Sequence, residues 1–183
     1  MYSSHRSRTI SSAGVFEKDV TLKIALKVGR LLEKDNIKVV YTRKNDTVSW
    51  PSNTKADLKE RVKISNEAKA DLFVSIHANS NTNTSYKGVE AWCRAPNTEG
   101  EKLARNIQKE LANYNYTTDR GIKYETEGSL AVFKLNNSTS TLVELGFLSN
   151  SSDAEFITSE SGQDKCAEAI EKGILNYKAS YKK

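Results

Sequence analysis

The sequence contains little cysteine, proline or histidine. Its two cysteines, Cys93 and Cys166, are far apart, and neither belongs to a Cys-x-x-Cys pair. This spacing excludes a thiolate metal site of the zinc-finger type and leaves a disulfide between the two undecided. With two prolines in 183 residues and 28% charged residues, the composition is that of an ordinary globular domain and not of a disordered chain.

Long hydrophobic runs are also missing. No apolar stretch approaches the roughly 18 residues that a membrane-spanning helix needs, so we expect no insertion into a membrane. Residues 1–8 lack the apolar core of a signal peptide. If the protein acts outside the cell, its export signal is expected to lie outside this chain.

The charge balance is positive but evenly spread. The chain has 28 Lys and Arg residues against 23 Asp and Glu residues, a formal net charge of +5. Because no dense Lys/Arg patch is present, we expect no nucleic-acid partner. The positive balance favours an anionic partner such as an acidic lipid or an anionic cell-wall polymer.

Apolar periodicity divides the chain into alternating helices and strands. Apolar residues recur at helical spacing in four segments, at 17–34, 56–68, 99–114 and 162–177. Short apolar or alternating runs predict strands at 37–42, 70–77, 88–93, 130–133 and 141–144. This alternation is typical of an α/β sheet with parallel strands and helices on both faces. The length suits one domain covering residues 1–183, with a frayed end at 178–183.

Two of the predicted strands carry residues with catalytic potential. His77, one of only two histidines, ends the run at 70–77, and Glu144 lies inside the apolar run at 142–147. A lone histidine at a strand end is more often a hydrogen-bonded rim residue than a metal ligand. An ionised carboxylate inside an apolar strand, however, has a desolvation cost of several kcal/mol unless it is paired or bound to a metal. Glu144 is therefore a functional candidate on its chemistry alone.

Glu17 adds a second carboxylate at the start of the first predicted helix. One imidazole and two carboxylates at the ends of core elements make up most of a catalytic zinc site with a general base. The sequence thus predicts that Glu17, His77 and Glu144 lie together.

Short motifs follow one another in a fixed order along residues 14–177. They comprise Val-Phe-Glu-Lys-Asp-Val at 15–20, Val-Tyr-Thr-Arg at 40–43 with Asp46, Leu-Lys-Glu-Arg at 58–61, Ala-Asp-Leu-Phe-Val-Ser-Ile-His-Ala-Asn at 70–79, Gly-Val-Glu at 88–90, Leu-Ala at 103–104, Asp-Arg-Gly at 119–121, Leu-Ala-Val-Phe at 130–133 and Val-Glu-Leu-Gly-Phe-Leu-Ser-Asn at 143–150. Taken together, they resemble the zinc-dependent N-acetylmuramoyl-L-alanine amidases, which hydrolyse the amide between muramic acid and the L-alanine of the peptidoglycan stem.

This resemblance implies a fold, a metal and a mechanism. The fold would be α/β, a single-domain twisted mixed sheet of about five or six strands flanked by helices on both faces. One Zn²⁺ would be held by Glu17, by His77 and by a histidine of an Asp-x-Gly-His-Gly loop. Glu144 would be the catalytic glutamate that takes a proton from the attacking water and returns it to the leaving amine.

The N-terminal segment 1–13 departs from the family, because the Asp-x-Gly-His-Gly loop and the strand before it are absent. His5 stands twelve residues before Glu17, close to the family's interval but without the flanking glycines. We expect His5 or water to complete the metal shell, although a histidine near a chain end is often only solvated.

The leading hypothesis is a monomeric, zinc-dependent peptidoglycan amidase that acts outside the cell or in the cell wall. The alternative is a catalytically impaired, truncated amidase fold that binds peptidoglycan or a partner without hydrolysis. A third hypothesis, a zinc peptidase that cuts elsewhere in the stem peptide, would use the same chemistry.

Overall fold

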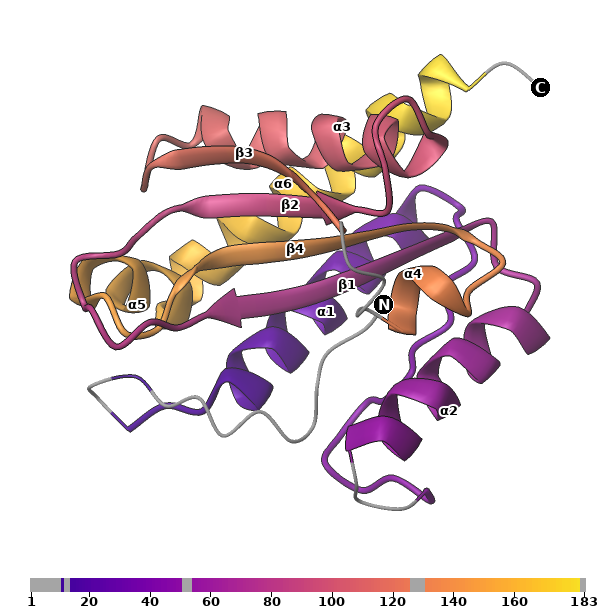
Figure 1. Cartoon of the computed structure of the whole chain (residues 1–183), viewed down its shortest axis with the longest axis horizontal. Coiled ribbons are helices and arrows are strands. Elements are labelled where there is room, and N and C mark those ends of the chain that lie inside the picture. The colour runs from indigo at the N-terminus through magenta and orange to yellow at the C-terminus, as the bar shows by residue number, and fades with distance from the viewer. Residues whose placement is uncertain (1–10, 12–13, 51–53, 126–130, 182–183) are drawn as a thin grey trace.

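The computed structural model describes residues 11, 14–50, 54–125 and 131–181 (Figure 1). Its elements in chain order are α1 (Glu17–Lys34), α2 (Thr54–Glu67), β1 (Leu72–Asn79), β2 (Val89–Cys93), α3 (Glu99–Asn113), β3 (Asp119–Tyr124), α4 (Ala131–Lys134), β4 (Thr139–Phe147), α5 (Ser151–Thr158) and α6 (Glu160–Ser180). None of the helices in these ranges combines the length and the apolar character that crossing a bilayer would need.

The strands form one mixed sheet in the order β1-β4-β2-β3. β1 pairs with β4 and β2 pairs with β3 in parallel, whereas β2 and β4 are antiparallel. The predicted α/β class with a mixed sheet is therefore confirmed, and within the described ranges the sheet has four strands instead of the expected five or six.

Helices cover the two faces of the sheet unequally. α3 and α6 lie behind it in Figure 1, and together with α1 they enclose the main core around Val74, Ile76, Val143 and Leu145. Because successive side chains of a strand point to opposite faces, Phe73 and Leu142 lie on the other face. They pack there in a smaller cluster with side chains of α2 and α4. This second cluster covers the early part of β1 and β4, and the later positions of the same face carry His77 and Glu144.

Two predicted strands were wrong. Residues 37–42 follow α1 without joining the sheet. The amide of Ile37 closes the helix end on the Leu32 carbonyl at 3.0 Å, and Ile37 and Val39 pack on the main core as an irregular segment. Residues 131–134 form α4. Val132 and Phe133 are neighbours in sequence and are buried in the same cluster, whereas a strand would send them to opposite faces.

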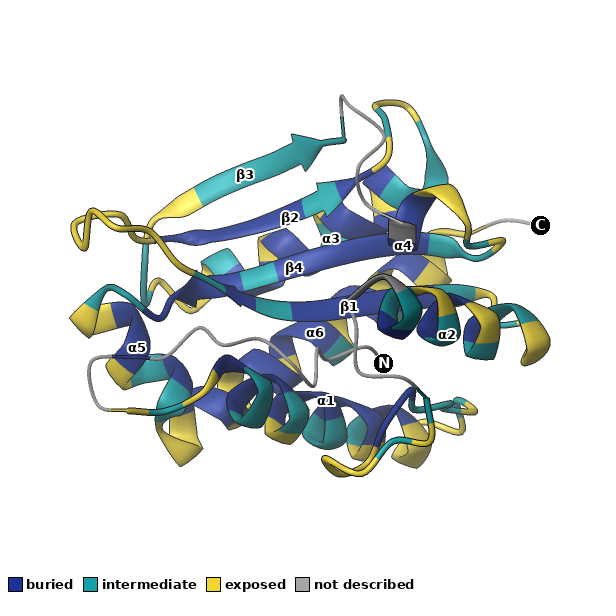
Figure 2. Cartoon of the chain, turned by 60° about the horizontal axis from the view of Figure 1, so that its bottom comes forward, coloured by how far each residue is buried: buried dark blue, intermediate teal, exposed yellow. Residues whose placement is uncertain are grey.

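Two described elements, β3 and α5, lie in segments for which the sequence predicts no helix or strand. β3 is an edge strand whose residues are mostly half-buried (Figure 2), so it lacks the apolar run that marks a buried strand. α6 continues through Ser180, into the segment 178–183 for which the sequence predicts a frayed end. Both cysteines are free and buried, and burial raises the pKa of Cys93 to about 11 and that of Cys166 to about 12.

Candidate active site

Four polar side chains form a row across the sheet, one from each strand. His77 of β1 is paired with Glu144 of β4, and Glu144 is paired with Glu90 of β2. Arg120 of β3 reaches the same row, since its Nε donates to Glu90 Oε2 at 2.7 Å. Paired residues on neighbouring strands point to the same face, so the sheet itself aligns this row.

Glu17 enters the row from the first turn of α1. The acidic side chain lies at the positive end of the helix dipole, which favours a carboxylate. It is buried, and its Oε1 lies 2.9 Å from His77 Nδ1 and accepts a hydrogen bond from the amide of Ala78 at 3.3 Å. Glu17 and His77, which are sixty positions apart in the sequence and were both predicted as site residues, are therefore in direct contact.

Glu144 carries an unusual carboxyl group. Its Oε2 is buried and has no hydrogen-bond partner among the residues that the structure describes. Burial raises the pKa of this carboxyl well above its ordinary value, and the negative charges of Glu17 and Glu90 raise it further. The group therefore holds a proton more tightly than an exposed glutamate does.

Glu90 is a further functional candidate, which the sequence marks only through the Gly-Val-Glu motif at 88–90. It is buried and accepts three hydrogen bonds, from Arg120 to Oε2 and from Trp92 Nε1 (3.1 Å) and Asn79 Nδ2 (3.3 Å) to Oε1. The desolvation argument applied to Glu144 applies equally to this carboxylate in the run at 88–93. That signal was sufficient to find it.

The donor set fits zinc. A histidine nitrogen and a glutamate oxygen are ordinary zinc ligands, and two ligands of one tetrahedral ion lie roughly 3.3 Å apart, close to the 2.9 Å between His77 Nδ1 and Glu17 Oε1. In the described part of the chain, no group of three or more His, Cys, Asp or Glu residues could hold a metal. The expected third ligand, His5, lies outside the described residues.

Arg43 and Arg61 stay outside the row. Arg43 pairs with Asp46 at 2.9 Å, and the fully buried Arg61 pairs with Asp57 at 2.8 Å. Arg43 also donates to the carbonyl of Lys18 in α1 at 2.5 Å, and Arg61 of α2 donates to Thr42 Oγ1 at 3.2 Å. These contacts tie residues 42–46 to α1 and α2.

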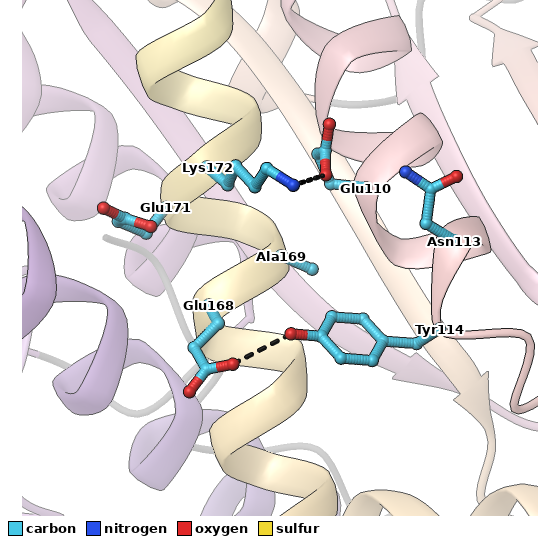
Figure 3. Close-up of a pocket in the computed structure, with 7 residues that line it drawn as sticks. All are labelled: Glu110, Asn113, Tyr114, Glu168, Ala169, Glu171 and Lys172. Carbon is cyan, nitrogen blue, oxygen red and sulfur yellow. Dashed lines mark hydrogen bonds and ion pairs between the residues drawn. The ribbon is translucent and has the colours of Figure 1, made fainter.

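Two hollows in the described structure lie away from this row. One, of about 230 Å³, lies between α3 and α6 on the helical face (Figure 3), where Lys172 pairs with Glu110 and Tyr114 donates to Glu168. The other, of about 530 Å³, lies between residues 36–42, the end of α2, the start of β1 and the end of α6. Neither is lined by Glu17, His77, Glu90 or Glu144.

A family model described as N-acetylmuramoyl-L-alanine amidase matches residues 3–176. The chain belongs to the N-acetylmuramoyl-L-alanine amidase family. The amidase is 37% identical over 172 residues to the germination-specific N-acetylmuramoyl-L-alanine amidase of Bacillus subtilis, covering 89% of this chain and 71% of that protein. It is 38% identical over 168 residues to LytC of the same organism, covering 90% of this chain but only 32% of LytC.

The fold of the amidase is shared with solved family members. The crystal structure of an N-acetylmuramoyl-L-alanine amidase from Clostridium difficile 630 superimposes with a TM-score of 0.85 at 34% identity, covering 99% of this chain and 94% of that one. The resemblance stated from the motifs is confirmed, as is the prediction that the chain is an amidase, a hydrolase of amide bonds. The roles of Glu17, His77, His5 and Glu144 remain predictions.

Proposed function

We propose that the chain is a zinc-dependent amidase that hydrolyses the bond between N-acetylmuramic acid and L-alanine in peptidoglycan, with Glu144 as the general base. The observation that supports this proposal is that Glu17, His77 and Glu144 lie close together. Glu17 Oε1 and His77 Nδ1 lie 2.9 Å apart. The β1–β4 pairing sets Glu144 beside His77, and the buried Oε2 of Glu144 has no hydrogen-bond partner among the described residues.

Glu17 Oε1 and His77 Nδ1 are the atoms proposed to hold the metal, with His5 or water completing its shell. Bound zinc supplies a Lewis acid that polarises the scissile carbonyl and makes water more acidic. The amide of Ala78, which donates to Glu17 Oε1 at 3.3 Å, orients this carboxylate toward the imidazole. Such supporting contacts fix a ligand in its binding geometry.

Glu144 is proposed to move the proton. Its Oε2 accepts a proton from the attacking water and donates it to the nitrogen of the leaving L-alanine as the amide bond breaks. A raised pKa suits this double role, because a carboxyl that binds its proton weakly would be a poor acid in the second step. Three donors hold the carboxylate of Glu90 next to Glu144, and the charge of Glu90 contributes to the raised pKa of Glu144.

The family supports the substrate and the place of action. Two staphylococcal relatives bear the name "Probable cell wall amidase LytH", and we propose action on peptidoglycan in the cell wall or outside the cell. The net charge of +5 favours binding to anionic wall polymers as well. We propose a monomer, since the row of site residues is assembled from one chain.

Zinc content is the first test. The purified chain, supplied with zinc and then dialysed, is expected to hold about one equivalent of the metal by elemental analysis. His77→Ala should lose the metal, because Glu17 and one further ligand cannot form a tight site. Glu155→Gln, on the exposed side of α5, is the matched control and should keep it. Well under one equivalent in the parent, or full occupancy in His77→Ala, would contradict the proposed site.

Glu144→Gln tests the base. The variant keeps the shape of the side chain but cannot accept the proton, so zinc should stay bound while release of L-alanine amino groups from muropeptides falls roughly 100-fold or more. Equal rates in parent and variant would make Glu144 a structural residue. A parent that binds zinc and peptidoglycan but releases no amino groups would favour the alternative, a non-catalytic binding module.

A further inference from the structure

Arg120 is the member of the polar row that the proposed chemistry does not use. Four contacts fix its position. Its Nε donates to Glu90, and its guanidinium carbon lies 5.2 Å from the ring centroid of Phe147 and 5.9 Å from that of Tyr86. Its aliphatic stem lies against Gly88, where an added Cβ would come within 2.5 Å of Arg120 Cδ. A side chain held from so many directions is preorganised for binding.

The outer part of this guanidinium is free to bind a ligand. Arginine has five N–H donors, and the described residues use only the one on Nε of Arg120. The side chain is 30% exposed. Because its stem lies against Gly88 and its Nε donates to Glu90, we assign this exposure to the terminal nitrogens. Because Glu90 engages the inner nitrogen, the terminal pair keeps the planar fork that binds a carboxylate through two parallel hydrogen bonds.

The charges around the row indicate which ligand this fork would take. Glu17, Glu90 and Glu144 are all carboxyl groups, and Arg120 is the cation that this row contributes. An anionic part of the substrate would be disfavoured beside the carboxylate of Glu90 and attracted by the guanidinium of Arg120 on β3. Arg120 therefore offers the favourable position for a negative group on a substrate bound over the row.

Sheet geometry limits how far that group lies from the scissile amide. β3 is two strands from β4, or roughly 10 Å at the usual strand spacing, and the Arg120 side chain reaches back by one strand to Glu90. The remaining separation of roughly 5 Å corresponds to about one or two residues of extended peptide from Glu144. The carboxyl of L-alanine is used in its peptide bond, so the next residue of the stem is the first that can carry a free carboxylate.

We propose that Arg120 binds a carboxylate of the stem peptide, on the residue that follows L-alanine, and so selects stems in which that carboxylate is free over stems in which it is amidated. The proposal rests on the proposed function, because it places the peptide over the row with its scissile amide at Glu144. Arg120 is in this sense a specificity residue and takes no part in proton transfer.

The test compares two synthetic ligands, N-acetylmuramoyl-L-alanyl dipeptides that differ only in a free carboxylate or a carboxamide on the second residue. Binding is measured by calorimetry in the Glu144→Gln background, so that hydrolysis does not interfere. The carboxylate ligand is expected to bind about tenfold more tightly, and Arg120→Gln should reduce this ratio to about one. Arg120→Lys keeps the charge without the fork and should give an intermediate ratio.

Arg94→Gln is the matched control, because Arg94 is exposed just beyond the opposite end of β2 and its removal changes the net charge equally. It should leave the ratio at about tenfold. A ratio near one in the Arg120-containing protein, or an undiminished ratio in Arg120→Gln, overturns the proposal. A competition experiment adds inorganic phosphate at the same concentration as the carboxylate ligand. If phosphate displaces the carboxylate ligand, the guanidinium of Arg120 binds the phosphates of wall polymers instead, and the proposal is overturned.

The outcome is separable from that of the proposed function. If Arg120→Gln fails to fold by circular dichroism, Arg120→Lys and the ratio in the Arg120-containing protein still decide the question. A parent that discriminates between the two ligands without hydrolysing either would refute catalysis and keep the binding role. A parent that hydrolyses both ligands with equal kcat/KM would support catalysis and refute the binding role of Arg120.

Discussion

Asp153 is a buried carboxylate that ties together the strand ends around the candidate site. It lies in the first turn of α5 and is fully buried. Its Oδ2 accepts hydrogen bonds from the amides of Gly88 and Phe147, both at 2.9 Å, and its Oδ1 accepts one from Thr117 Oγ1 at 2.5 Å. The three donors precede β2, end β4 and precede β3 respectively. We predict that Asp153→Ala destabilises the fold strongly.

The magnitude follows from the groups that would be left without partners. Alanine would orphan two buried backbone amides, and each such group has a desolvation cost of about 1–3 kcal/mol. The loss in unfolding free energy is therefore about 2–6 kcal/mol, before any relief from water that enters the space. Thr117→Val removes a single hydroxyl donor and should lower the unfolding free energy by about 1–2 kcal/mol.

Urea unfolding followed by circular dichroism measures these differences. Glu155→Ala, on the exposed side of the same helix, is the control and should stay within about 0.5 kcal/mol of the parent. If Asp153→Ala also unfolds within about 1 kcal/mol of the parent, the carboxylate does not hold the three strand ends together.

The elements with a strong apolar period were predictable from the sequence. Val20, Ile24 and Val28 recur at helical spacing in the predicted helix at 17–34, and all three are buried in the main core. The three- or four-residue spacing of apolar side chains is set by the helix itself, so it can be recognised without knowing how the rest of the chain folds. The same holds for the runs around His77 and Glu144, where burial on both faces leaves an apolar sequence.

The missed and misassigned elements are those whose identity depends on neighbours. β3 is a polar strand that exists because β2 offers it a free edge, and nothing in residues 119–124 alone demands a sheet. The apolar run at 130–133 is too short for periodicity to separate strand from helix. α4 is helical where it packs with α2 on the second face of the sheet.

The candidate site was predictable in part. The contact of Glu17 with His77 agrees with the expectation that a helix start and a strand end meet at one edge of the sheet. The Glu90–Arg120 pair was not predicted, since it depends on the strand order β4-β2-β3 and on the parallel register of β2 with β3. Register between distant strands is set by the whole core and cannot be read from either strand alone.

Two further predictions concern stability at positions outside the candidate site. Arg61→Met should lower the unfolding free energy by about 3–5 kcal/mol, because it removes the cation that pairs with the buried carboxylate of Asp57. The double variant Arg61→Met/Asp57→Leu should recover much of that loss in urea unfolding. A double variant as unstable as Arg61→Met would show that packing matters more than charge at this position. Glu171, beside the hollow in Figure 3, tests the pH dependence. Burial, followed by a hydrogen bond with Asp35, raises the pKa of Glu171 to about 7, so the folded state holds this proton more tightly than the unfolded state. The stabilisation from Glu171 is therefore complete below the unfolded pKa of about 4.3 and is lost as the pH rises through about 7. Glu171→Gln stays neutral throughout, so the variant should lose less stability than the parent between pH 5 and pH 8, with Glu155→Gln as the exposed control. Equal losses in parent and Glu171→Gln would show that Glu171 titrates alike in the folded and unfolded states.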